Sequence, residues 1–186
     1  MKELLLDRYE VIEEAGSGGF ASVVVAWDTR IQRKVAIKCM PLSGARLNEI
    51  GQENLASRSI LVDSDSLNAA AIPGLEEARM AAMLNDANIV SVYDFEIQGD
   101  TAYLILEYIE GMTLGELLAH YSEQITTDVI AAVFKAVSHA LEVAHKNKVL
   151  HLDIKPDNFL IDKQGQVKVV DFGLARLAGE YVFCTA

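Results

Sequence analysis

The sequence predicts an α+β fold in which an antiparallel sheet with one main helix precedes a mainly helical part. Segments rich in β-branched residues and alternating in polarity recur through roughly the first hundred positions, as expected of neighbouring paired strands. Beyond Gly111 the apolar residues recur at helical spacing instead, most clearly over residues 126–146. We therefore place a domain boundary here, with a first domain over 1–110 and the beginning of an incomplete second domain over 111–186.

The first domain is expected to hold its strands and its helix in a fixed order. The strands are placed at residues 9–14, 22–29, 34–40, 89–97 and 101–109. Residues 41–74 are polar and lack a clear periodicity, so we expect an irregular insertion there. A helix is expected over 75–85, where acidic residues in the first turn suit the helix dipole. Gln98-Gly99-Asp100 is a predicted hairpin turn between the last two strands.

The second domain is predicted to begin with a short helix over 113–121 and a longer one over 126–146. Apolar residues of the longer helix share one face, at positions 130, 133, 134, 137, 141 and 144. Thr126 or Thr127 can cap its start, and basic residues suit its C-terminal end. Two short strands are then expected, at 159–161 and 167–170, around a turn at Gly165.

Composition excludes several classes of protein. The formal net charge is -11, which argues against a nucleic-acid binder because such proteins present basic surfaces. The two cysteines, Cys39 and Cys184, lie far apart and in no metal-binding spacing, so we expect no structural disulfide and a reducing, cytoplasmic location. No signal peptide or membrane-spanning run is evident. We expect no membrane contact from this segment, although a longer parent could carry a C-terminal anchor.

A glycine-rich stretch, Gly16-Ser17-Gly18-Gly19-Phe20-Ala21-Ser22-Val23, allows several interpretations. A dinucleotide-binding fingerprint requires a helix after the glycines, but the residues that follow favour a strand. A Walker A loop requires Gly-Lys followed by Ser or Thr, and the sequence has no such step. A hairpin whose backbone N–H groups cover phosphates agrees with both flanks. A tight turn without a ligand remains the alternative.

Lys38 ends the run Val35-Ala36-Ile37-Lys38 on the third predicted strand. An ammonium group among apolar residues is costly unless it is paired, so Lys38 requires a carboxylate partner. The helix over 75–85 offers two, Glu76 and Glu77. We favour Glu77, because it shares a helix face with apolar residues. A lysine in this position can reach phosphate oxygens under the glycine hairpin.

The run His151-Leu152-Asp153-Ile154-Lys155-Pro156-Asp157-Asn158 is followed downstream by Asp171-Phe172-Gly173. Phosphoryl transfer requires mainly positioning and charge neutralisation from a protein. Asp153 can orient an attacking hydroxyl and accept its proton, and Lys155 can neutralise the γ-phosphate. Asn158 and Asp171 offer the oxygen ligands that Mg²⁺ prefers. This run is the strongest indication of chemistry in the sequence.

Together, GSGGFASV, VAIK, HLDIKPDN and DFG resemble the signature set of the eukaryotic-type Ser/Thr protein kinases, in bacterial style. The resemblance covers essentially the whole chain. It implies a protein-kinase-like fold, with an N-lobe over 1–110 and part of a C-lobe over 111–186. It also implies the cofactors ATP and Mg²⁺, and transfer of the γ-phosphate to Ser or Thr of a protein substrate.

The resemblance assigns roles by position. Asp153, Lys155, Lys38 and Glu77 would be catalytic, and Asn158 and Asp171 would hold the metal. ATP would be bound by a larger set: Ala15, Gly16, Ser17, Gly18, Gly19, Phe20, Ala21, Val23, Ala36, Lys38, Leu106, Glu107, Ile109 and Leu160. Leu106 would be the gatekeeper, and the backbone of Glu107 and Ile109 would bind adenine.

Some residues depart from the family pattern. Ala21 stands at the third glycine position, where we expect tolerance. Leu152 replaces an arginine that pairs with an activation-loop phosphate in relatives, so we expect the parent not to require that phosphorylation. The insertion over 41–74 lengthens the step between Lys38 and Glu77, and we interpret it as a tolerated surface segment.

The chain ends soon after Gly173, without the A-P-E motif or the later C-lobe helices of the family. We therefore expect a kinase truncated within the activation segment, with apolar surface exposed on the helix over 126–146. Such a chain is expected to bind nucleotide weakly and to phosphorylate protein poorly. The alternative hypothesis is a non-catalytic, pseudokinase-like module that binds nucleotide or acts as a scaffold.

Overall fold

The computed structural model describes residues 4–17, 21–42, 72–172 and 176–177. The chain divides into two compact units. The first unit comprises Met1–Ala78 and Val92–Tyr108, and the second comprises Arg79–Ser91 and Ile109–Ala186. The expected α+β class is confirmed, since an antiparallel sheet dominates the first unit and the longest helix lies in the second.

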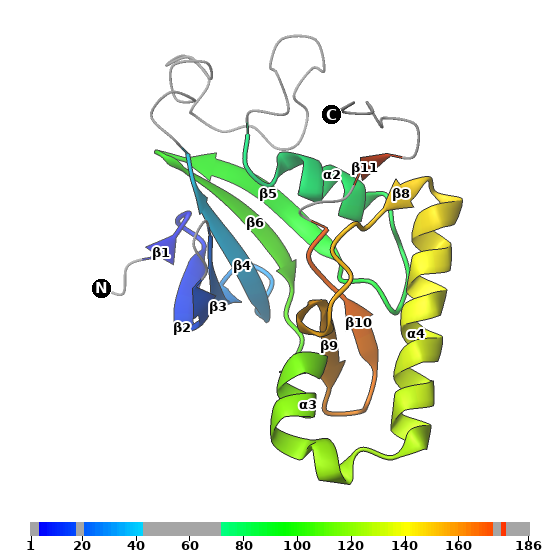
Figure 1. Ribbon diagram of the computed structural model, residues 1–186. Helices are drawn as coiled ribbons and strands as arrows, with labels where there is room; N and C mark the ends of the chain where they lie inside the picture. The colour runs from blue at the N-terminus through cyan, green and yellow to red at the C-terminus, as the bar shows by residue number, and fades with distance from the viewer. Residues whose placement is uncertain (1–3, 18–20, 43–71, 173–175, 178–186) are drawn as a thin grey trace, which may run out of the picture. The chain divides into compact units, whose positions relative to one another are not determined.

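The first unit is built on a six-stranded antiparallel sheet with the order β1-β2-β3-β4-β6-β5 (Figure 1). Its strands are β1 (Leu4–Leu5), β2 (Tyr9–Ser17), β3 (Ser22–Asp28), β4 (Arg33–Pro41), β5 (Val92–Gln98) and β6 (Thr101–Glu107). Helix α2 (Leu75–Ala82) precedes β5. The strands and helix expected in this part are therefore confirmed in type and order, with ends that shift by a few residues.

Apolar side chains cover both faces of this sheet. One buried cluster joins strands and α2, and includes Met40, Leu75, Ala78, Phe95 and Leu104. The other cluster is held by Leu6, Tyr9, Val24, Ala26, Val35, Ile37 and Ile105. Because alternate residues of a strand point to opposite faces, β4 contributes Met40 to the first cluster and Val35 and Ile37 to the second, whereas β3 contributes to the second alone. The hairpin expected at residues 98–100 is confirmed, with Gly99 at a φ of 61° and Gln98 paired with Thr101.

The second unit joins short strands to the longest helix that the structure describes (Figure 1). Its elements are β7 (Gly111–Thr113), α3 (Leu114–Tyr121), the 3₁₀ turn η2 (Ser122–Gln124), α4 (Thr127–Lys146), β8 (Val149–Leu150), η3 (Pro156–Asn158), β9 (Phe159–Asp162), β10 (Val167–Val169) and β11 (Arg176–Leu177). The strands form two small antiparallel sheets, β10-β9-β7 and β11-β8. Gly165, at a φ of 81°, makes the expected turn between β9 and β10.

A threonine caps the start of each helix of the second unit, as the sequence predicts for α4. Thr113 and Glu116 form a capping box at the start of α3, and the hydroxyl of Thr126 accepts a bond from the amide of Val129 at the start of α4. One side of α4, including Val133, is buried. Phe134, by contrast, is 70% exposed, so the expected apolar surface is present on this helix.

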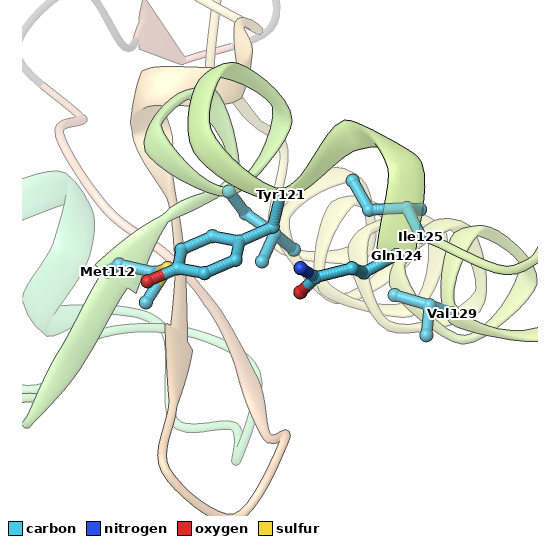
Figure 2. Close-up of a pocket in the computed structure, with 6 residues that line it drawn as sticks. Met112, Tyr121, Gln124, Ile125 and Val129 are labelled. Atoms are coloured by element: carbon cyan, nitrogen blue, oxygen red, sulfur yellow. The ribbon is translucent and has the colours of Figure 1, made fainter.

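An apolar cavity of about 300 Å³ lies where β7, α3, η2 and α4 meet in the second unit (Figure 2). Its lining consists of Met112, Leu117, Tyr121, Gln124, Ile125 and Val129. Tyr121 and Gln124 are the lining residues with polar side chains (Figure 2). Among the described residues, no helix combines the length and apolar character needed to cross a membrane.

The start of the strand expected at 89–97 was wrong. The strand β5 begins at Val92, and Ile89 instead forms an isolated parallel bridge with Val169 in the second unit. The short strands β1, β7, β8 and β11 were not expected either. Each has two or three residues, which is too few to show a period of two in a sequence.

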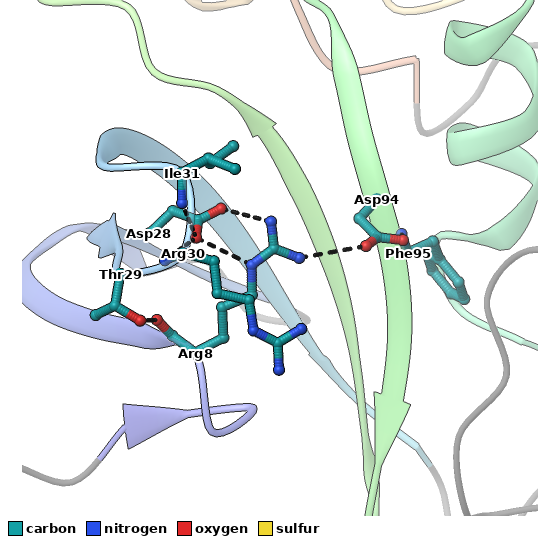
Figure 3. A network of polar contacts seen from close by, with 7 residues as sticks. All are labelled: Arg8, Asp28, Thr29, Arg30, Ile31, Asp94 and Phe95. Carbon is teal, nitrogen blue, oxygen red and sulfur yellow. Dashed lines mark hydrogen bonds and ion pairs between the residues drawn. The ribbon is translucent and has the colours of Figure 1, made fainter.

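A polar network anchors the turn between β1 and β2 to the sheet of the first unit (Figure 3). The Arg8 guanidinium donates to both carboxylate oxygens of Asp28, at 3.0 and 2.6 Å, and lies 3.8 Å from the carboxylate of Asp94. Burial pushes the pKa of Asp28 upward, but hydrogen bonds from Arg8 and from two backbone amides outweigh burial and lower it. Asp28, which is 1% exposed, is therefore ionised at neutral pH.

Candidate active site

The ion pair expected between Lys38 and Glu77 is present within the first unit. Lys38 Nζ lies 2.7 Å from Glu77 Oε2, and the two side chains are 19% and 6% exposed. Glu77 is carried by the face of α2 that is buried, as the sequence analysis expected in choosing it over Glu76. A lysine on a strand and a glutamate on a helix thus satisfy each other in a largely water-excluded place, where either charge alone would be costly.

Three of the side chains predicted to bind ATP share one face of the sheet with Lys38. Directly paired residues point to the same face, and Lys38 pairs with Val23. Ala36 lies two residues earlier on β4 and pairs with Leu106. Val23, Ala36, Lys38 and Leu106 therefore form one continuous surface of the first unit, and Glu107 ends the strand that carries Leu106. Ile109 and Leu160 belong to the second unit.

The glycine-rich stretch joins two antiparallel strands. Gly16 and Ser17, at the end of β2, pair with Val23 and Ser22 of β3, and Ala15 precedes them on β2. A strand, and no helix, follows the glycines, which excludes the dinucleotide-binding fingerprint. Gly18, Gly19 and Phe20 lie outside the described residues. A side chain at Gly16 would meet nothing within 4 Å, so the strand leaves open space here.

The predicted catalytic loop, residues 151–158 of the second unit, is organised around the carboxylate of Asp153. Its Oδ2 accepts hydrogen bonds from Lys155 Nζ at 2.7 Å and from Asn158 Nδ2 at 3.0 Å. These two bonds, Lys155 first, lower the pKa of Asp153, and the same contact raises the pKa of Lys155. At neutral pH Asp153 is therefore an ionised carboxylate and the neighbouring Lys155 is a protonated ammonium group.

Asn158 is oriented by bonds from its amide nitrogen. Nδ2 donates to the backbone oxygen of Asp153 at 2.8 Å as well as to its carboxylate, and the side chain is 4% exposed. The amide oxygen, Oδ1, has no hydrogen-bond donor assigned to it among the described residues. An orientated amide oxygen that is not used inside the protein is a suitable ligand for a hard cation.

The hairpin formed by β9 and β10 brings Asn158 and Asp171 to the same end of one sheet. Phe159, the first residue of β9, pairs with Val169, the last residue of β10. Asn158 directly precedes that pair and Asp171 follows it closely. The amide of Val170 also donates to the backbone oxygen of Asn158 at 3.0 Å. An amide oxygen and a carboxylate at one strand end form a donor set that fits Mg²⁺.

His151 is a functional candidate to which the sequence analysis gave no role. It is 2% exposed, and its ring packs on Phe172 with centroids 4.6 Å apart. The amide of Asp153 lies 3.3 Å from Nδ1, which must therefore accept, so the ring hydrogen is on Nε2 and is donated to the Val170 oxygen at 3.0 Å. Burial lowers the pKa of His151, which keeps this neutral form. Its position at the start of the catalytic run is the signal that could have indicated it.

Two residues beside these groups have left-handed backbones. Leu152 has a φ of 63° and Asp171 a φ of 62°. For a leucine this conformation costs about 1 kcal/mol, and it persists where the surroundings enforce it. Here the neighbours of Leu152 on both sides, His151 and Asp153, are held by the hydrogen bonds described above. Strain of this kind is typical of functional sites.

Comparison with known proteins shows the family to which the chain belongs. Residues 9–184 match the family model described as "Protein kinase domain". The chain is 35% identical over 173 residues to the serine/threonine-protein kinase PrkC of Bacillus subtilis, covering 90% of this chain and 23% of that protein. It is 36% identical over 177 residues to the serine/threonine-protein kinase PknL of Mycobacterium tuberculosis, covering 95% of this chain and 39% of that protein. The chain belongs to the protein kinase family.

Proposed function

We propose that this chain binds Mg²⁺-ATP and carries the catalytic groups of a Ser/Thr protein kinase, which transfers the γ-phosphate of ATP to a protein hydroxyl. The observation that carries the proposal is that Lys155 and Asn158 both donate hydrogen bonds to the carboxylate of Asp153. The curated relatives support the choice of Ser/Thr, because PrkC and PknL are named serine/threonine-protein kinases. The chain spans only 23% of the length of PrkC and 39% of the length of PknL. Protein phosphorylation, an activity of whole kinases, is therefore a proposal for this chain.

Asp153 would orient the hydroxyl of the substrate and accept its proton. A carboxylate with a lowered pKa is a weak base, so its main contribution is to position the hydroxyl oxygen for attack. Lys155 donates to Asp153 and has further N–H groups to offer to a phosphate. The same ammonium can therefore hold the attacking side and neutralise the transferred group.

Asn158 and Asp171 would hold Mg²⁺, which neutralises the charge on the phosphates when it is bound. In the first unit, Lys38 would contact the phosphates and Glu77 would hold Lys38 in place. Val23, Ala36 and Leu106 would contact adenine, since they form the apolar part of the same sheet face. We place the protein substrate, a polypeptide with an accessible Ser or Thr, in the cytoplasm.

A second function is favoured by the exposed face of α4. Ile130 is 46% exposed and Phe134 is 70% exposed, which is unusual for large apolar residues on one helix. Such a surface is typical of a protein contact, so a non-catalytic module that binds nucleotide or acts as a scaffold is the alternative. The two functions differ in whether phosphoryl transfer occurs once nucleotide is bound.

Calorimetric titration of Mg²⁺-ATP into the purified chain tests the proposal first. Lys38→Met and Asp171→Asn are the matching variants, and unchanged circular dichroism is required of both. Saturable binding that depends on Mg²⁺ and is weakened in both variants supports the nucleotide site. Transfer of labelled phosphate from ATP to a Ser/Thr-containing protein, if it is lost in Asp153→Asn, then supports the kinase function. Binding without transfer favours the module, and the absence of binding by a folded wild type contradicts both.

A further inference from the structure

The segment between α2 and β5 lies beside β10 within the second unit and is joined to it by backbone hydrogen bonds around one isolated parallel bridge. The amide of Val169 donates to the Asn88 oxygen at 2.8 Å, and the amide of Val90 donates to the Val169 oxygen at 3.0 Å. Ile89, between them, forms the parallel bridge with Val169 and is 1% exposed. The opposite edge of β10 is paired with β9. The strand that leads to Asp171 is thus held along both of its edges.

The side chains of this segment add bonds that a strand alone would not make. Asn88 Nδ2 donates to the Val167 oxygen at 2.7 Å, so Asn88 contacts β10 at its first and last residues. Asp86 Oδ1 accepts from the Asn88 amide at 2.8 Å, and Asp86 Oδ2 lies 3.0 Å from His139 Nε2 on α4. A chain of contacts therefore runs from α4 through Asp86 and Asn88 to β10.

The far end of β10 leads directly into the candidate metal ligand. Val170 donates its amide to the Asn158 oxygen and accepts from His151 at its own oxygen, each at 3.0 Å. Asp171 follows in a left-handed conformation, with little freedom to compensate for a shift of the strand. We propose that Asn88, held by Asp86 and His139, is a positioning residue for Asp171. This inference rests on the proposed function, because it takes Asp171 as a ligand of Mg²⁺.

The role is one of position and not of general support. Pairing between β9 and β10, with the turn at Gly165, keeps the hairpin formed when the Asn88 side chain is removed. Removing the side chain eliminates the hydrogen bond from Asn88 Nδ2 to the Val167 oxygen. This bond fixes the position of β10 along the 86–90 segment. Partners beyond the ligands themselves commonly change metal affinity by about 10-fold or more. Asn88 acts through β10, so we expect about a fivefold effect, the value of one net hydrogen bond.

The test compares ATP binding with and without Mg²⁺ in the full chain, by calorimetry. The dissociation constant without Mg²⁺, divided by the dissociation constant with Mg²⁺, gives the factor by which the metal strengthens ATP binding. We call this factor the Mg²⁺ ratio. In Asn88→Ala we expect this ratio to fall about fivefold while the affinity for metal-free ATP is unchanged. Asn147→Ala is the matched control, since Asn147 also donates its amide to a backbone oxygen, Val143 on α4, at 2.9 Å. An equal loss with and without Mg²⁺ would overturn the inference.

Variants of His139 test the remote end of the chain of contacts. His139 is 52% exposed, so substitution there spares the core. His139→Ala removes the bond to Asp86 and should lower the Mg²⁺ ratio, whereas His139→Gln keeps an N–H donor and should restore it. Equal ratios in wild type, His139→Ala and Asn88→Ala would refute the positioning role, because neither contact would then influence the metal.

Hydrogen exchange in the absence of ligand separates this inference from the proposed function. Amides of Val170 and Asp171 should exchange faster in Asn88→Ala than in wild type or in Asn147→Ala, with circular dichroism unchanged. If the wild type binds no Mg²⁺-ATP, the proposed function fails, and the exchange result alone decides whether Asn88 positions the strand. Unchanged exchange at both amides would sink the inference even if Mg²⁺-ATP binds well.

Discussion

Replacing Gly111 by alanine should strongly destabilise the second unit. A Cβ at this position would lie 1.9 Å from the Ile161 oxygen, 2.7 Å from its carbonyl carbon and 2.8 Å from the Asp162 Cα. All three atoms are backbone, so no side-chain rotation can relieve the overlap. The strands β7 and β9, which pair over Gly111–Thr113, must separate instead. The requirement for glycine is steric, since the backbone here is not left-handed.

The magnitude follows from what the separation removes. Overpacking typically costs about 1–3 kcal/mol, and each backbone hydrogen bond that is lost costs about 1 kcal/mol net. With part of the β7–β9 pairing lost, we expect a decrease of about 3 kcal/mol in the free energy of unfolding. A loss of this size is a large part of the stability of a small unit.

Urea unfolding followed by circular dichroism is the assay, because α4 contributes much of the helical signal. Gly16→Ala is the matched control, since an added Cβ there meets nothing within 4 Å. We expect the midpoint to fall markedly for Gly111→Ala and to stay within error for Gly16→Ala. Equal midpoints for Gly111→Ala and wild type would refute the steric argument.

Three further predictions concern single side chains. The Tyr9 hydroxyl is buried and has no hydrogen-bond partner among the described residues, so Tyr9→Phe should leave stability unchanged or raise it by about 1 kcal/mol, as measured by the fluorescence of the single tryptophan, Trp27. Asp28→Asn should cost about 3 kcal/mol at pH 7, because it removes the bidentate carboxylate partner of Arg8 and leaves only the longer contact with Asp94; since the folded pKa of Asp28 is lowered, the wild-type advantage should disappear as the pH falls below about 4. The lowered pKa of Asp153 should keep the acid limb of any transferase pH profile below about pH 4, and a limb near neutrality would show that another group titrates.

The roles of individual site residues were predicted from local patterns, and the structure supplies their contacts. The charge of Lys38 within an apolar strand required a buried acid, and the amphipathic face of the next helix indicated Glu77. Asp153, Lys155 and Asn158 lie within one short run, so their contacts with one another follow from chain connectivity. The catalytic and metal-binding roles of these residues stay predictions.

Sequence by itself determined the features that arise from neighbours along the chain: the strand and helix periods, the helix caps, the turns at Gly99 and Gly165, and the kinase motifs. Only the tertiary structure decided the pairings between distant segments. Ile89 is a β-branched residue that favours strands, yet it pairs with Val169 in the second unit and not with β6. His151 and Val170 likewise meet only after folding. Backbone hydrogen bonds between distant segments are nearly independent of residue type. Packing therefore decides which segments pair, and the sequence of either segment alone does not reveal its partner.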